Sequence, residues 1–242
     1  MEERRRAWWA SGFALVLAAT TGAAAVHLWW LPCRGTMLVG TPLASFGDAA
    51  DVADGCVDRM GEGTPFPLPT AAASSSPGLL ALIVVTIVAV AVAWLLPVLT
   101  EPLSGTSRLV AALPGFAALG VAVLAVGIAY DVPGAEEVAY PLATFLNLLV
   151  VSGFAVLLGQ VGTWPRHLVT ALALSSMGFA GPIVNYLLMV HWSDLNWDAP
   201  PGSGYLTAAF LLVCGIAVLA LTFLRRPAPP MAARRVPAEV AA

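Results

Sequence analysis

Charged side chains are scarce in this chain. Of its 242 residues, 11 are basic and 14 are acidic, while 59% are hydrophobic. An ordinary soluble domain is about 25% charged and about 45–50% apolar, so a soluble chain of this length carries on the order of sixty charges. The shortage excludes a water-soluble single domain and indicates that lipid covers much of the surface. The mean hydropathy of +0.86 also excludes a disordered chain.

Other absences exclude further classes of function. The chain has no lysine, which excludes a retinal Schiff base, and its net charge of −3 comes without a basic stripe, which disfavours nucleic-acid binding. The motifs GxSxG, HExxH, CxxC and Walker A do not occur. We therefore expect no cofactor, no nucleic-acid partner and no catalysis of the kinds that these motifs support.

Long uncharged hydrophobic stretches are what the chain has instead. A helix crosses a ~30 Å hydrocarbon core with about 20 residues. Six stretches reach this length, at residues 7–31, 78–99, 109–130, 138–160, 168–190 and 205–224. The sequence predicts an all-α membrane protein, a six-transmembrane-helix bundle over residues 7–224. We expect the second stretch, with only Thr86 as an ordinary polar group, to be the most exposed to lipid.

The arginines predict the orientation of this bundle. If residues 1–6 are cytoplasmic, nine of the eleven basic residues lie inside and only Arg34 and Arg59 lie outside. Both termini are then cytoplasmic, residues 225–242 form a disordered cytoplasmic tail, and residues 32–77 form one long extracytoplasmic loop. Tryptophans near the predicted boundaries are expected to anchor the helices at the interfaces: Trp8, Trp9 and Trp164 inside, and Trp29, Trp30, Trp192 and Trp197 outside.

The first stretch also allows interpretation as a secretory signal, because arginines precede it and Ala23-Ala24-Ala25 offers a cleavage point. The stretch continues to Trp30, which is longer than a signal core and favours a retained helix. Cleavage would leave five spans with the same sidedness.

The long outer loop holds two of the three cysteines, Cys33 and Cys56. Both face an oxidising compartment in the predicted orientation, so we expect a disulfide bond between them. Residues 47–60 have the pattern of a short amphipathic helix, and the bond would tie this helix to the outer end of the first span.

Neutral polar residues of the fourth and fifth stretches form a candidate polar lining, made up of Thr144, Asn147, Ser175 and Asn185. Gly181 and Pro182 predict a helix kink beside them, because proline frees a backbone carbonyl one turn earlier. Such residues act either as hydrogen-bonding contacts between helices or as the lining of a substrate path.

Two histidines, His27 and His191, lie near the outer ends of their stretches and are candidates for a metal site, although no third ligand accompanies them.

The prediction that follows from the whole sequence is a non-catalytic, multi-pass accessory or structural subunit of a membrane assembly. One alternative is a small transporter or channel for a neutral or weakly cationic solute. Another is an enzyme acting at the outer surface through His27, His191 and Asp194. We expect the cell (plasma) membrane as its location. The abundance of Ala, Gly and Pro, with Arg in place of Lys, favours a bacterial source. Its expected contacts are lipid together with a membrane-protein partner or a second copy.

Overall fold

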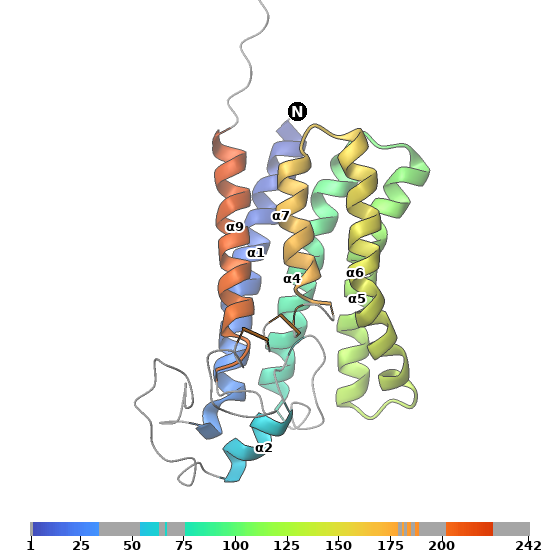
Figure 1. Ribbon diagram of the computed structural model, residues 1–242. Helices are drawn as coiled ribbons and strands as arrows, with labels where there is room; N and C mark the ends of the chain where they lie inside the picture. The colour runs from blue at the N-terminus through green and yellow to red at the C-terminus, as the bar shows by residue number, and fades with distance from the viewer. Residues whose placement is uncertain are drawn as a thin grey trace, which may run out of the picture.

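The computed structural model describes residues 2–33, 54–62, 66, 76–178, 181, 183–184, 187–188 and 202–224. These residues form helices and contain no strand, which confirms the all-α prediction. The elements are α1 (Glu2–Trp29), the short 3-10 turn η1 (Leu31–Cys33), α2 (Asp54–Glu62), α4 (Pro77–Thr100), α5 (Gly105–Ala129), α6 (Ala135–Gln160), α7 (Trp164–Ser175) and α9 (Tyr205–Leu224) (Figure 1).

Five of the helices are long and apolar enough to cross a bilayer: α1, α4, α5, α6 and α9. They correspond to five of the six predicted stretches. The stretch at 168–190 begins within α7, which ends at Ser175, and residues 179–180, 182, 185–186 and 189–190 lie outside the described residues. The sixth span therefore stays a prediction.

The helices form a bundle with α4 near its centre. α4 packs along α1 on one side and α5 on the other, and it also contacts α7. α9 packs along α1, and α6 packs along α5. Two glycines allow α1 and α9 to approach closely, because a Cβ on Gly12 would overlap Leu219 and a Cβ on Gly215 would meet Val16 and the Gly12 carbonyl.

The central position of α4 overturns the expectation that it is the most lipid-exposed helix. In its most apolar window 61% of the residues are buried, against 28–44% in the other four long helices. Thr86 is fully buried, and its hydroxyl lies 2.8 Å from that of Thr21 on α1. A helix that faces lipid and a helix that faces other apolar helices both lack polar side chains. Composition alone therefore does not distinguish the two cases, and the prediction was wrong.

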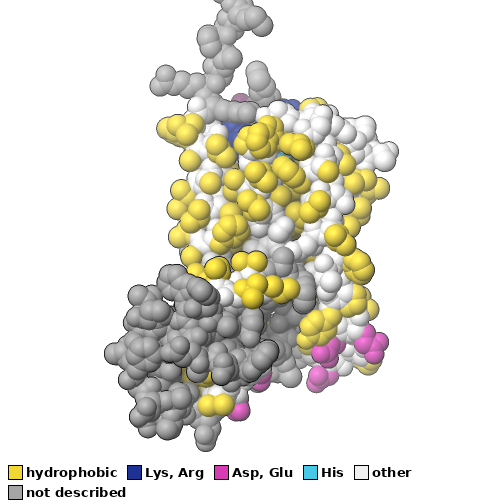
Figure 2. Space-filling model, in the orientation of Figure 1, with side chains coloured by type: hydrophobic (Ala, Val, Ile, Leu, Met, Phe, Trp, Pro, Cys, Tyr) yellow, Lys and Arg dark blue, Asp and Glu magenta, His cyan; other side chains and the backbone are white. Residues whose placement is uncertain are grey.

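The connections alternate between the two ends of the bundle. The chain start, the α4–α5 connection, the α6–α7 connection and the end of α9 lie at one end, here called the N-terminal end (Figure 1). The turn η1, α2, the α5–α6 connection and the start of α9 lie at the opposite end. Figure 2 shows a flank covered by apolar side chains, with basic side chains visible at the N-terminal end and acidic ones at the opposite end.

The opposite end contains the predicted disulfide bond. Cys33 and Cys56 are bonded, with their Cα atoms 4.8 Å apart, so α2 is fastened to the end of α1. The guanidinium of Arg59 on α2 lies 4.3 Å from the ring centre of Trp29, which adds a cation–π contact. Of the amphipathic helix predicted at 47–60, the structure describes residues 54–60 as helix, and residues 47–53 lie outside the described residues.

Candidate functional site

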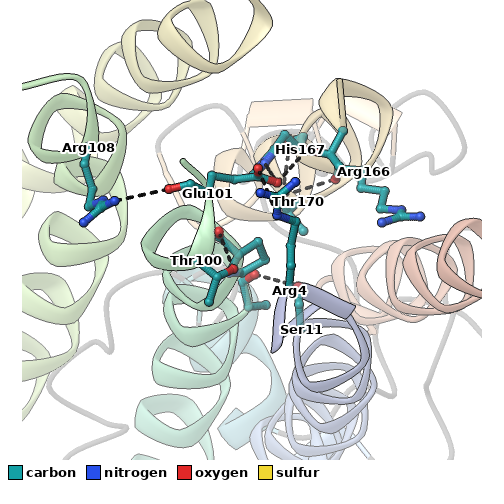
Figure 3. A network of polar contacts seen from close by, with 11 residues as sticks. Arg4, Ser11, Thr100, Glu101, Arg108, Arg166, His167 and Thr170 are labelled. Atoms are coloured by element: carbon teal, nitrogen blue, oxygen red, sulfur yellow. Dashed lines mark hydrogen bonds and ion pairs between the residues drawn. The ribbon is translucent and has the colours of Figure 1, made fainter. Parts of the chain in front are cut away.

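A group of charged and polar side chains, buried except for a partly exposed arginine, lies at the N-terminal end of the bundle. We call it the charged cluster and define it as Arg4, Glu101, Thr163, Arg166 and His167. These residues come from α1, from the residue after α4, and from the start of α7. The cluster therefore joins three segments that are far apart in the sequence (Figure 3).

Local sequence explains why Glu101 leaves the helix. Pro102 follows it, and a residue before proline avoids helical backbone angles. Glu101 accordingly has extended angles, φ −74° and ψ 146°, and α4 ends at Thr100. The turn places its carboxylate inside the bundle, where only 1% of the residue is exposed.

Three side chains surround the Glu101 carboxylate. Thr163 donates a hydrogen bond from Oγ1 to Oε1 at 2.6 Å, and Nε of Arg4 lies 3.5 Å from Oε2. Nε2 of His167 lies 3.5 Å from Oε1, which is longer than an ordinary hydrogen bond and corresponds to a polar contact. The backbone carbonyl of Glu101 also accepts a bond from Arg108 at 3.3 Å. A buried carboxylate needs such partners, because its desolvation costs several kcal/mol.

The start of α7 supplies two of these groups. Pro165 occupies the first turn, where a missing N–H costs nothing and the fixed φ favours helix. Thr163 stands at the N-cap position but does not cap its own helix, and its hydroxyl binds Glu101 instead. His167 follows within the first turn and is fully buried. Arg166 donates a bond to the carbonyl of Leu221 at 2.9 Å and so links α7 to α9.

Two tryptophan rings enclose His167. The ring of Trp8 is edge-on to it with centroids 4.7 Å apart, and that of Trp94 lies 6.2 Å away. Nε1 of Trp94 donates to the carbonyl of Ala111 at 2.8 Å, whereas Nε1 of Trp8 and Nδ1 of His167 have no hydrogen-bond partner among the described residues. Trp8 is fully buried, as are Trp29 and Trp30 at the other end, so these three pack inside the protein rather than anchoring it in the interface.

The surroundings set the protonation of Glu101, which lies outside the long helices. Burial raises the pKa of this carboxyl, but the contacts with His167 and Thr163 and the charge of Arg4 outweigh burial and lower the pKa overall. His167 precedes the predicted span at 168–190. Burial lowers its pKa, and the opposing effect of Glu101 is smaller. At neutral pH the cluster therefore holds an ionised Glu101 and an uncharged His167.

The predicted polar lining is only partly brought together. Thr144 is exposed on α6 and donates to the carbonyl of Tyr140 in its own helix at 2.8 Å. Asn147 is half-buried against Gly178, where a Cβ would overlap Oδ1, and this buried oxygen has no hydrogen-bond partner among the described residues. Asn185 lies outside the described residues.

Ser175 lines a cavity of about 360 Å³ between the end of α7 and α9. Its described lining is largely apolar and includes Leu172, Val184 and Phe210, and neither Thr144 nor Asn147 belongs to it. Gly181 lies close to the carbonyl of Ser176, while Pro182 lies outside the described residues, so the predicted kink stays a prediction. Whether these residues form a solute path also stays a prediction.

The candidate metal ligands stay a prediction as well. His27 is exposed, and its Nδ1 lies 3.3 Å from the hydroxyl of Tyr205. His191 and Asp194 lie outside the described residues.

Sequence reasoning missed the charged cluster because its charges stand just outside the hydrophobic stretches. A signal was nevertheless present. Glu101 is the only acidic residue in the two short connections that were predicted to be cytoplasmic, and it is followed by proline. His167 stands in the other of these connections, directly before a predicted span.

Comparisons with known proteins give no relative from which a function could be transferred. No protein-family model, no curated protein and no solved structure matches this chain. The described residues show a polytopic membrane protein with several helices that suit a bilayer, and its function has to be proposed from its own residues.

Proposed function

We propose that this chain is a non-catalytic, multi-pass subunit of a larger assembly in a bacterial cell membrane. The observation that carries the proposal is the enclosure of the Glu101 carboxylate by side chains of other segments. This ionised side chain is enclosed by Arg4, Thr163 and His167, so it fixes three segments to one another and offers no open charged site. A structural subunit of an assembly needs contacts of this kind, because they hold its helices in fixed positions.

Six spans with both termini in the cytoplasm are part of this proposal. Support comes from the alternation of the connections between the two ends of the bundle (Figure 1). α6 ends and α7 begins at the N-terminal end, whereas α9 begins at the opposite end, so residues 164–204 connect the two ends. Arg108 and Arg166 lie at the N-terminal end, which agrees with cytoplasmic retention of arginine.

Surfaces for a partner are available on both the flank and the opposite end. α6 has the smallest buried share of the five long helices and exposes large apolar side chains that include Phe145, Leu148 and Val151. Lipid or another membrane helix can cover such a face. The disulfide-fastened α2 gives a fixed outer surface for the same partner or for a second copy of the chain.

Purification from the native membrane tests this proposal. A chromosomally tagged chain is extracted in digitonin and separated by native electrophoresis, and its bands are analysed by mass spectrometry. We expect one defined complex with a partner or a second copy in constant ratio, unchanged by a mild rise in salt. A chain that runs only as a detergent-bound monomer of 25.0 kDa would contradict the proposal.

Transport of a small neutral or weakly cationic solute is the second candidate, favoured by Oδ1 of Asn147, which lies beside Gly178 and has no hydrogen-bond partner among the described residues. A buried amide oxygen without a partner is costly unless water or a solute reaches it. Proteoliposomes are tested with urea, glycerol and methylammonium by stopped-flow light scattering. Transport predicts entry faster than into empty liposomes and its loss in Asn147→Leu, whereas equal rates in both would exclude these solutes.

A further inference from the structure

We propose that the cavity between the end of α7 and the start of α9 binds a lipid-soluble molecule that carries a neutral carbonyl group, with Ser175 and Thr207 as its hydrogen-bond donors. The site is separate from the charged cluster and from Asn147, because none of those residues lines the cavity. The proposal goes beyond the proposed role in an assembly and does not depend on it, since a chain that forms no complex can still bind such a molecule.

The cavity is apolar and lies at the depth of the bilayer. Its volume is about 360 Å³, and small-molecule sites in proteins have about 300–1,000 Å³. Its described wall includes Leu172 on α7 and Leu206 and Phe210 on α9, and α9 is a candidate membrane span. Ser175 ends α7 about 16 Å from the start of that helix, at 1.5 Å per residue, and Leu206 stands in the first turn of α9, at the opposite end of the bundle (Figure 1). The wall therefore extends from the middle of the bundle toward that end, which suits an elongated apolar molecule.

Two hydroxyl groups distinguish this cavity from a plain lipid-facing groove. A hydroxyl on a membrane helix ordinarily donates to a carbonyl one turn earlier, because no water is there to accept its proton. Thr86 on α4 and Thr222 on α9 do so at 2.7 Å, and so does Ser176, which also lines the cavity. The hydroxyls of Ser175 and Thr207 have no hydrogen-bond partner among the described residues. They are the donors that the cavity offers to a ligand.

The chemistry of the wall selects a neutral acceptor. Each hydroxyl can donate one hydrogen bond. Backbone carbonyls at the end of α7 are already used, since that of Ser175 accepts from the N–H of Gly178 and that of Leu172 from the N–H of Ser176. The described wall contains no ionisable side chain, so a carboxylate or an ammonium group would lie there without a counter-charge. A ketone or ester carbonyl gives the hydroxyls an acceptor without adding charge. Quinones and the acyl esters of phospholipids both have this chemistry.

Photolabelling of the full chain tests the site. The chain is placed in nanodiscs of a diether phosphatidylcholine, which has no carbonyl group. The probe is methyl palmitate with a diazirine in its chain, and mass spectrometry locates the labelled residues. We expect the label to concentrate in peptides covering 172–176 and 206–210, and not in the outward-facing peptide 144–152 of α6. Hexadecane, which has a chain but no carbonyl, should displace the probe poorly.

Two competitors identify the source of the carbonyl. Displacement of the probe by decylubiquinone at a lower mole fraction than by dioleoylphosphatidylglycerol would support the proposal with a quinone as ligand. The reverse order would support it with a phospholipid ester as ligand. Equal labelling of the α6 peptide, or displacement by hexadecane as effective as by these two, would overturn the proposal.

Four variants test the wall itself. Ser175→Ala and Thr207→Val each remove one hydroxyl, and each should raise the probe concentration for half-maximal labelling about fivefold, the effect of one ordinary hydrogen bond. Leu172→Trp fills the cavity and should abolish labelling there. Thr144→Val loses a hydroxyl that donates within its own helix, so it should label as the wild type does. If one hydroxyl variant does not fold, the other and the wild-type competition still decide. Unchanged labelling in the folded hydroxyl variants would overturn the proposal.

Discussion

Thr163 donates a hydrogen bond to the carboxylate of Glu101 at 2.6 Å across 62 residues of sequence. The bond gives the N-cap residue of α7 a partner at the end of α4, in place of a capping contact within its own helix. A buried carboxylate thereby becomes a structural tie between two membrane segments. Its energetic contribution is open to direct measurement.

Replacing Thr163 by valine removes this bond at almost constant volume. A hydrogen bond to a charged group contributes about 1.5–3 kcal/mol, so we expect a loss of that size in the free energy of unfolding. Unfolding in mixed micelles with rising SDS measures it. Thr144→Val is the matched control, because this exposed hydroxyl donates to the carbonyl of Tyr140 in its own helix, so its loss should change stability little. Equal stability of Thr163→Val and the wild type would show that the hydrogen bond to Glu101 does not stabilise the fold.

The stabilising effect of Glu101 depends on pH in a defined sense. Its pKa is lowered in the folded protein from an ordinary value of 4.5, so its contribution is complete above about pH 4.5 and is lost as the pH falls through the folded-state pKa. Melting temperatures between pH 5 and pH 3.5 should fall in the wild type, and the gap to Glu101→Gln should close. The exposed Glu2, paired with Arg6, gives the control Glu2→Gln, which should melt in parallel with the wild type. A gap that widens towards low pH would contradict the assignment.

Close packing between α5 and α6 gives a third prediction, at two glycines of one helix. A Cβ on Gly153 would lie 2.9 Å from Cγ of Pro114 and 3.3 Å from the carbonyl oxygen of Ala111, neither of which moves easily. Gly153→Ala should therefore destabilise the protein by about 1–3 kcal/mol. Gly159→Ala meets nothing within 4 Å and should be neutral or stabilising by up to about 1 kcal/mol, because alanine favours helix. The same SDS titration compares them, and equal effects would show that α5 and α6 are not in close contact here.

Loss of the disulfide bond should loosen the opposite end of the bundle. The bond closes a separation of 23 residues, which corresponds to roughly 3 kcal/mol in the chain-entropy model. Cys33→Ser should make α2 sensitive to trypsin at Arg59 in right-side-out vesicles, while Cys214→Ser, at a buried thiol of α9, should leave cleavage unchanged. Resistance of α2 in Cys33→Ser would show that the contact of Arg59 with Trp29 suffices to hold it.

Hydrophobic length was enough to predict the spans that the structure describes, because every backbone group in a bilayer has to be satisfied within a helix. The disulfide bond was predictable from the placement of Cys33 and Cys56 on one side of the membrane. Which helices are neighbours was not predictable. The hydropathy of α4 is the same whether lipid or the helices α1 and α5 cover it.

The charged cluster shows the same limit at the level of single residues. Glu101 and His167 stand 66 positions apart. Both lie in connections between predicted spans, which sequence analysis assigns to solvent-exposed loops. Their burial depends on how α1 packs against this end of the bundle, with Arg4 beside Glu101 and Trp8 beside His167. This is a property of tertiary packing, and only the Glu101-Pro102 pair gave a local hint of it.

The topology is the central claim of this account, because the sidedness of the disulfide bond, the cluster and the partner surfaces all depend on it. Paired fusions of alkaline phosphatase and green fluorescent protein after Ala242 measure it most directly, since the first is active only outside the cytoplasm and the second fluoresces only inside. Six spans with a cytoplasmic N-terminus predict a fluorescent, phosphatase-negative fusion. An active phosphatase without fluorescence would place the C-terminus outside the cytoplasm and contradict the proposed topology.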